Sequence, residues 1–198
     1  MILDSYSVMV VNLDNRPERW KATETELKNF GFQQIQRFSA IPGGESGCAK
    51  SHYECLRGDG NLFLFEDDVI FEPGAMEILL KAVEQLPDDF DLFYLGANVK
   101  EPAIYYSENL YQITRGTHCT HAILYSDKGR KLMRSLWRPD NTTYRQIDHW
   151  MYMIGQAALK CYVCYPLIAF QRPDYSDIRM QWFDYREEML ENQKNNMR

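Results

Sequence analysis

Three consecutive acids, Glu66, Asp67 and Asp68, interrupt an apolar run in NLFLFEDDVIF, residues 61–71. Carboxylates are rarely buried unless they are paired or bind a metal ion. A divalent cation such as Mg²⁺ or Mn²⁺ prefers carboxylate and phosphate oxygens and would offset the repulsion among these acids. Because side chains alternate along a strand, Glu66 and Asp68 should lie on one side and Asp67 on the other.

The alternative to a metal site is an exposed turn without a function, and PDDFD at 87–91 serves as an internal comparison. Its adjacent acids follow a proline in a polar loop before an apolar run, which is typical of a plain turn. Residues 66–68 have apolar neighbours on both sides instead. This contrast favours a metal site at 66–68.

The elements around these acids are predicted from apolar periodicity and from Gly and Pro positions. Strands are expected at 5–13, 34–40, 61–66, 91–97, 121–126 and 160–170, and helices at 14–31, 46–58, 73–86, 127–137 and 145–157. Asn15 and Ser46 are expected to cap the first two helices. Alternating strands and helices predict an α/β fold, with a mainly parallel twisted sheet and helices on both faces.

Other parts of the chain give weaker signals. Residues 98–120 are expected to be irregular, with one edge strand, and the tail from Trp182 should be a helix whose polar end frays. No repeat or linker divides the sequence, so a single domain over residues 1–198 is predicted.

Composition excludes several classes of protein. The chain has 198 residues, 45% of them hydrophobic, and a net charge of -6, which argues against nucleic-acid binding. No apolar run approaches the roughly 18–20 residues that cross a bilayer, and the start lacks the basic residues of a signal peptide. Five cysteines fit a reducing compartment, so a cytoplasmic location is expected. Cys161 and Cys164 form a CxxC, but in a strand they should face opposite sides, and HCTH at 118–121 is the sole second pair for a zinc site.

A series of motifs in order along the chain resembles glycosyltransferase family 25, which includes lipooligosaccharide galactosyltransferases and collagen hydroxylysine galactosyltransferases. The matching pieces are VVNLDNRPERW, RFSAIPG, GCAKSH, FLFEDDV, DLFYLG, GTHCTHAILYSDKGRKL, QIDHW and YPLIAFQRPDYSDI. Each motif is weak alone, but together they cover almost the whole chain. Since the chain is short for the family, its acceptor-binding additions should be minimal.

The resemblance implies a GT-A fold, a UDP-sugar donor, Mn²⁺ (or Mg²⁺) as cofactor, and inverting transfer of galactose or glucose to a hydroxyl of a glycan or glycoprotein acceptor. It places the metal on Asp68 with Asp67 or Glu66, and the general base on Asp148, whose apolar neighbours suit a carboxylate facing a sugar. The donor site is expected to include, besides Glu66 and Asp67, the residues Asn12, Arg16, Arg19, Lys50, Ser51, His52, Gln171, Ser176 and Asp177.

Alternatives stay open at this stage. The arginines could belong to a solvated helix face, His52 could be structural, and Asp148 could cap or pair on a helix. A nucleotidyltransferase could use the same acids and metal, although it usually has a Gly-rich basic loop after the first strand and NLDNRPER contains no glycine. A non-catalytic sugar-binding module would be expected to have lost the acids or the base, and both are present.

Overall fold

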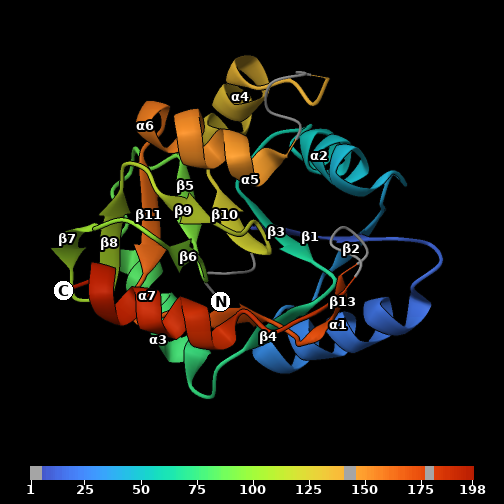
Figure 1. The fold of residues 1–198 in the computed structure, drawn as a ribbon, viewed down its shortest axis with the longest axis horizontal. Helices are drawn as coiled ribbons and strands as arrows, with labels where there is room; N and C mark the ends of the chain where they lie inside the picture. The colour runs from blue at the N-terminus through green and yellow to red at the C-terminus, as the bar shows by residue number, and fades with distance from the viewer. Residues whose placement is uncertain (1–5, 141–145, 177–180) are drawn as a thin grey trace.

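A computed structural model of the chain describes residues 6–140, 146–176 and 181–198. Within them the main sheet has eight strands in the order β2-β1-β3-β10-β5-β11-β8-β7 (Figure 1). Their bounds are β1 Ser7–Asn12, β2 Gln36–Ser39, β3 Leu62–Glu66, β5 Leu92–Tyr94, β7 Ile104–Ser107, β8 Leu110–Ile113, β10 Ala122–Tyr125 and β11 Cys161–Cys164. The sheet is mixed but mostly parallel in direction, because only β10 and β8 oppose the rest.

Three short two-stranded sheets accompany the main one. They pair β4 (Val69–Phe71) with β12 (Ala169–Gln171), β6 (Asn98–Val99) with β9 (Thr117–His118), and β13 (Asp174–Ser176) with β14 (Gln181–Phe183). The β4–β12 pair sits directly after the acids, with Gln171 opposite Val69. The last strands of the chain are thereby brought to the acidic turn.

Helices cover both faces of the sheet, as predicted. Their bounds are α1 Pro17–Phe30, α2 Gly44–Cys55, α3 Ala75–Gln85, α4 Asp127–Leu136, α5 Ile147–Trp150, a π-helical segment Met151–Gly155, α6 Gln156–Ala158 and α7 Arg186–Asn196. Figure 1 shows α2, α4, α5 and α6 on one side of the sheet and α1 and α3 on the other. None of the helices in the described ranges is long and apolar enough to cross a bilayer.

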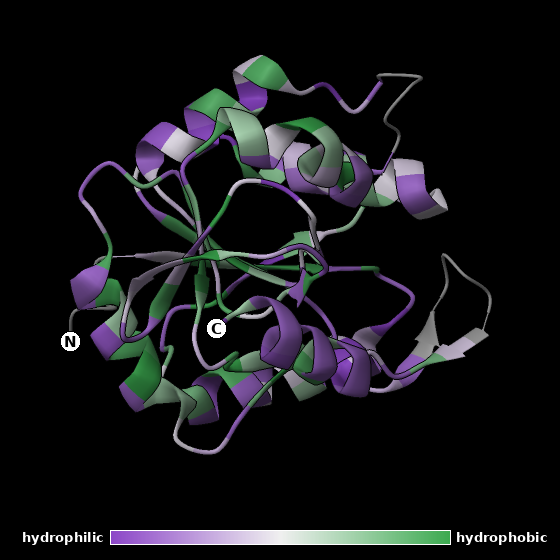
Figure 2. Ribbon diagram, turned by 60° about the vertical axis from the view of Figure 1, so that its left-hand side comes forward, coloured by the Kyte–Doolittle hydropathy of each residue, from purple (hydrophilic) through white to green (hydrophobic). Residues whose placement is uncertain are grey.

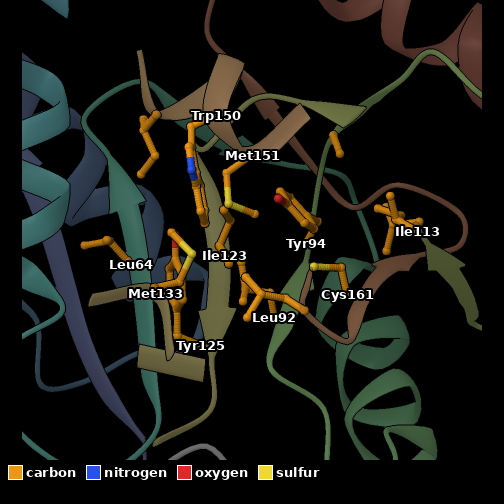
Figure 3. Close-up of a cluster of buried hydrophobic side chains, with 14 of the residues drawn as sticks. Leu64, Leu92, Tyr94, Ile113, Ile123, Tyr125, Met133, Trp150, Met151 and Cys161 are labelled. Carbon is orange, nitrogen blue, oxygen red and sulfur yellow. The ribbon is translucent and has the colours of Figure 1, made fainter. Parts of the chain in front are cut away.

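Two apolar cores, one on each face, hold these layers together. One joins β1, β3 and β10 to α1 and α3, for example through Phe65 and Leu79. The other joins the sheet to α2, α4 and α5, and Figure 3 shows Trp150 and Met151 pointing from α5 and the π-helical segment toward Ile123 on β10. Figure 2 shows the hydrophobic strands between helices of mixed character. Near-continuous apolar strands are expected where a sheet is buried on both faces.

The helix boundaries correct two predicted caps. Helix α1 starts at Pro17 with Arg16 at its N-cap and no side-chain cap, so Asn15 does not cap it. Helix α2 starts at Gly44, which places Ser46 inside the helix. The predicted stop at Gly31 is confirmed, since its φ of 120° allows its N–H to donate to the carbonyls that end α1.

Two predictions about the second half of the chain were wrong. Residues 98–120 contain β6, β7, β8 and β9 rather than one edge strand. The polar end of the chain does not fray: Gln193 accepts a hydrogen bond from the Leu167 N–H at 2.6 Å, Asn196 donates to the Val99 carbonyl at 2.8 Å, and Met197 is buried. Amides on α7 therefore satisfy backbone groups of the body of the protein.

Candidate active site

Glu66, the last residue of β3, turns toward α2. Its Oε1 lies 3.2 Å from Nε2 of His52 and accepts a hydrogen bond from the Thr120 hydroxyl at 2.8 Å. Burial by itself raises the pKa of Glu66, but the His52 imidazole and the Thr120 hydroxyl outweigh burial and lower it. Glu66 is therefore an anion held against buried polar side chains.

Asp67 turns the opposite way, toward α1. Its Oδ2 accepts from the Asn12 side-chain amide at 2.7 Å, and its Oδ1 lies 3.3 Å from the Arg19 guanidinium. The Thr23 hydroxyl donates to the Asp67 backbone carbonyl at 2.7 Å and fixes the turn. The predicted alternation of Glu66 and Asp67 across the strand is confirmed, and both Asp67 oxygens are occupied.

Asp68 has one carboxylate oxygen without a protein partner. Gln171 on β12 donates to Oδ2 at 3.2 Å, and the Arg172 N–H donates to the Asp68 carbonyl at 2.6 Å. Oδ1 is buried and makes no hydrogen bond. Burial, followed by the charges of Glu66 and Asp67, raises the pKa of Asp68 to about 7. A buried carboxylate oxygen that has no hydrogen-bond partner and lies near other negative charges fits a divalent cation. The positive charge of a bound cation would favour the ionised form of Asp68 and lower its pKa.

Asp148 lies on α5, which the buried side chains of Ile147 and Trp150 anchor to the core. Gln146 at the start of α5 donates to Glu45 and ties α5 to α2. Burial, followed by the charge of Glu66, raises the pKa of Asp148 to about 6. Its Oδ1 is buried without a partner. Asp148 is thus held on the same side of the acidic turn as Glu66, with one oxygen available for a proton.

The loop before β10 completes the surroundings of Asp148. Contacts with the Thr120 side chain and with the Cys119 backbone partly lower the pKa of Asp148. Cys119 has a φ of 79°, the only positive φ at a non-glycine residue in the described ranges. A side chain held in this left-handed region is strained, and such strain gathers at functional sites. Neither Thr120 nor Cys119 was among the predicted site residues, although both stand in the HCTH motif.

The two arginines expected to meet a diphosphate pair with acids in this structure. Arg19 donates through Nε to Asp174 on β13 at 3.1 Å in addition to its contact with Asp67. Arg16 lies 2.9 Å from Glu18 and 3.9 Å from Asp174. Asp174 was not predicted, because it lies far from the arginines in sequence and only the β13–β14 hairpin brings it there. Asn12 is held by Arg37, which donates to its Oδ1 at 2.8 Å.

The GCAKSH segment is divided between the two faces of α2. Lys50 is exposed, whereas Ser51 and His52 are buried. The Ser51 hydroxyl accepts from the Ile41 N–H and donates to the Gly47 carbonyl, both at 2.8 Å. These contacts give Ser51 a structural role, tying α2 to the preceding loop. Ser176 lies on β13, while the predicted Asp177 lies outside the described residues.

The zinc pairing of CxxC with HCTH is not formed. Cys161 and Cys164 are buried in β11, between β5 and β8. His121 is instead buried with Nε2 3.3 Å from the Ala169 carbonyl. The turn predicted at PDDFD is confirmed at Asp88 and Asp89.

Comparisons with known proteins identify the family and the fold. The model of glycosyltransferase family 25 (LPS biosynthesis protein) matches residues 11–136, a span that contains the end of β1, the acidic turn and β10. A search of curated proteins found no match.

Among solved structures, a UDP-glucose pyrophosphorylase complexed with UDP-glucose is 12% identical, covers 96% of this chain and 80% of its own, and has a TM-score of 0.51. A glycosyltransferase involved in glycosylation of the major capsid of PBCV-1 is 9% identical, covers 80% of each chain and has a TM-score of 0.49. A Drosophila β-1,4-galactosyltransferase 7 mutant with manganese, UDP-Gal and xylobiose is 9% identical, covers 92% of this chain and 72% of its own, and has a TM-score of 0.47.

The pyrophosphorylase likeness shows a shared α/β fold and no more at that identity. The family model covers well over half of the sequence and includes the acids of the turn. The mixed, mostly parallel sheet with helices on both faces agrees with the GT-A type of fold. The chain therefore belongs to glycosyltransferase family 25.

Proposed function

We propose that this protein is an inverting glycosyltransferase that moves a hexose, galactose or glucose, from a UDP-sugar to a hydroxyl of a glycan or glycoprotein acceptor, with Mn²⁺ or Mg²⁺ as cofactor. The observation that carries the proposal is a pair of half-buried aspartates, Asp68 and Asp148, each with one buried carboxylate oxygen that has no partner. The charge of Glu66 contributes to raising the pKa of both carboxylates. Metal-dependent inverting transfer needs a metal ligand and a separate base, and these two acids would supply them.

Asp68 would hold the cation, and Glu66 and Asp67 are the two acids that precede it in sequence. When bound, the ion acts as a Lewis acid that stabilises negative charge on the departing diphosphate. Gln171 orients the Asp68 carboxylate through Oδ2, and leaves Oδ1 for the ion. Because both Asp67 oxygens already accept from Asn12 and Arg19, Asp67 supports the turn through these contacts.

Asp148 would accept the proton of the acceptor hydroxyl as that oxygen attacks the sugar. A general base works best when its pKa is close to the operating pH, because it is then both ionised and basic. A pKa of about 6 leaves Asp148 ionised near neutral pH while keeping it more basic than an ordinary aspartate. Its Oδ1 has no hydrogen-bond partner in the protein and would be the oxygen that accepts this proton.

The donor diphosphate would lie beside Asn12, Arg16 and Arg19 at the carboxyl end of β1, the edge where open α/β sheets bind ligands. Arg16 and Arg19 would then exchange part of their pairing with Asp174 for phosphate oxygens. His52, exposed Lys50, Ser176 and Asp177 complete the proposed border of the donor site. Ser51 acts by holding α2 in place.

The test is the thermal stability of the protein with UDP and Mn²⁺. A ligand that binds only the folded state raises the melting temperature by mass action. UDP with Mn²⁺ should raise it, and Asp68→Asn should remove the Mn²⁺-dependent part of the shift and abolish transfer, because an amide binds Mn²⁺ more weakly than a carboxylate. The matched control is Asp88→Asn in the exposed turn, which should behave like the unmodified protein. An unchanged Mn²⁺ titration in Asp68→Asn would remove Asp68 from the metal site.

A nucleotidyltransferase is the second candidate, and the fold shared with a UDP-glucose pyrophosphorylase favours it. That enzyme class joins a nucleoside triphosphate to a sugar phosphate, whereas a glycosyltransferase consumes the nucleotide sugar. Incubation with UTP and a hexose 1-phosphate should yield no UDP-hexose and no pyrophosphate. Incubation with UDP-hexose, Mn²⁺ and an acceptor should release UDP. The reverse pair of results would replace the proposed function with nucleotidyl transfer.

A further inference from the structure

A second cluster of metal-ligating side chains lies beside the acidic turn. Cys48 and His52 are four residues apart on α2, so they share one face of the helix. The Cys48 Sγ, a ring nitrogen of His52 and a carboxylate oxygen of Glu66 all lie within 4.8 Å of one another. No other trio of His, Cys, Asp or Glu ligand atoms comes this close in the described parts of the chain.

The spacing of these atoms is close to that of a bound ion. Two ligands at about 2.0–2.2 Å from a tetrahedral Zn²⁺ lie roughly 3.3–3.6 Å apart. His52 Nε2 and Glu66 Oε1 are 3.2 Å apart, so one edge of that tetrahedron is already formed. A Cys48 sulfur at the far limit of the cluster would have to approach by only about 1 Å, because Zn–S bonds are longer, about 2.3 Å.

His52 supplies an independent sign that a ligand is expected. The imidazole is fully buried, yet neither Nδ1 nor Nε2 makes a hydrogen bond of acceptable geometry. Buried polar atoms are nearly always satisfied, by protein, water or an ion. The charge around the cluster is negative, since burial and then Glu66, Asp148 and Asp68 raise the pKa of the Cys48 thiol well above its usual value. A cation would satisfy the ring and stabilise the thiolate together.

The surroundings also hold the cluster in place. The Thr120 hydroxyl donates to the same Glu66 oxygen at 2.8 Å, as outer hydrogen bonds to metal-binding carboxylates do. The Ser51 hydroxyl ties α2 to the Ile41 N–H and fixes the helix that carries both Cys48 and His52. Such support reduces the reorganisation that binding requires.

We propose that Cys48, His52 and Glu66 form a second cation site, distinct from the oxygen site at Asp68, which takes Zn²⁺ or a similar thiolate-seeking ion. One sulfur, one nitrogen and one oxygen ligand favour Zn²⁺, whereas Mn²⁺ and Mg²⁺ favour oxygen alone. Three protein ligands leave the fourth tetrahedral position open, as in zinc sites that bind water or a substrate group. The inference does not depend on the proposed function, because it concerns metal binding alone.

Cobalt provides the test, because Co²⁺ replaces Zn²⁺ and a Co²⁺–thiolate bond gives a charge-transfer absorption band in the near ultraviolet. Metal-free, reduced protein titrated with Co²⁺ should develop this band at one equivalent, and Zn²⁺ should remove it. Cys48→Ser and Cys48→Ala should each lack the band. Asp68→Asn should keep it, and so should Cys55→Ser, which alters another buried cysteine of the same helix. Absence of the band in the unmodified protein, its persistence without Cys48, or its loss in Asp68→Asn would overturn the proposal.

A second measurement separates binding from misfolding. With Mn²⁺ already saturating, Zn²⁺ should still raise the melting temperature of the unmodified protein and of Cys55→Ser, but not of Cys48→Ser. Each variant first has to show the far-ultraviolet circular dichroism of the unmodified protein, and Cys48→Ala replaces Cys48→Ser if the latter does not. A Zn²⁺ shift that survives in the folded Cys48 variant and disappears in Asp68→Asn would assign the zinc to the oxygen site and contradict the proposal.

Discussion

A raised pKa at a buried carboxylate lowers the stability of the fold at neutral pH, but it makes the carboxylate a stronger base. Asp148 binds its proton more tightly in the folded chain than when unfolded, since burial and Glu66 raise its pKa to about 6. By linkage, stability associated with Asp148 is lost as the pH rises from about 4, its unfolded pKa, through about 6. At neutral pH the ionised group therefore destabilises the fold.

Asp148→Asn tests this reading directly. The variant should lower the transfer rate by roughly 10²–10⁴-fold, the usual effect of losing a positioned base. Its melting temperature at neutral pH should not fall, because the amide removes a buried charge. UDP affinity should hardly change, since the proposed base would face the acceptor. A lower melting temperature with only a modest rate loss would make Asp148 structural, and a parallel loss of UDP affinity would move it to the donor site.

The pH dependence adds a second readout on the same residue. Transfer by the unmodified enzyme should fall as the pH drops below about 6, because protonated Asp148 cannot accept a proton. Glu66 should stay ionised through this range, since His52 and Thr120 lower its pKa. The residual activity of Asp148→Asn should lack this acidic limb. An identical limb in the variant would assign the titration to another group.

At this scale the sequence predicted residue types better than their partners. The opposite directions of Glu66 and Asp67 follow from strand alternation and could be foreseen. The pairing of Arg19 with Asp174, and the gathering of Cys48, His52 and Glu66, join residues from different elements. Only tertiary packing determines such contacts, and no local sequence pattern predicts them.

Among the elements, helix α2 contributes to both proposed sites, the one around Asp68 and Asp148 and the one formed by Cys48, His52 and Glu66. Gly47 lies so close to the preceding loop that an added Cβ would overlap the Ile41 carbonyl oxygen and come 2.7 Å from the Pro42 carbonyl carbon. Those atoms are backbone and cannot rotate away. The close approach explains why glycine stands at this point of GCAKSH.

Gly47→Ala should therefore destabilise the protein by about 1–3 kcal/mol, the usual effect of overpacking. It should also displace Cys48 and His52, which follow on the same helix, and weaken the Co²⁺–thiolate band. The control is Ser46→Ala on the same turn, which should change little because Ser46 does not cap α2. Denaturant unfolding of the two variants measures the difference. Equal stability would show that the loop relaxes around the new methyl group.

Prediction from the sequence succeeded for elements long enough to show a repeating apolar pattern and failed for elements too short to show one. Helices α1, α3 and α4 carry ten or more residues each and were found near their predicted bounds. Strands β6 and β9 have two residues each and exist through their pairing with each other across an intervening hairpin. Two residues cannot show a period, so these strands were invisible in the sequence.

At the scale of the whole molecule, the C-terminal helix α7 packs against the rest of the protein and contributes to its stability. Met189 on α7 is fully buried, and the neighbouring Leu190 is exposed. Met189→Ala should cost about 2–5 kcal/mol, as other large-to-small core changes do. Leu190→Ala should stay within about 0.5 kcal/mol of the unmodified protein. Chemical unfolding compares the two, and a Met189→Ala variant as stable as its control would mean that α7 detaches without consequence.

The strand order links completion of the fold to the order in which the chain is made. Strands β3 and β5 are not bonded to each other, since β10 lies between them and pairs with both. A growing chain that ends before residue 122 lacks both β10 and β11, so β3 has one unpaired edge and β5 has no strand partner. Such edges invite association with other chains. Cys119 and Thr120, which contact Asp148, immediately precede β10. A nascent or interrupted chain would therefore be prone to association, and the segment that joins β3 to β5 also carries the residues that contact Asp148, the proposed base.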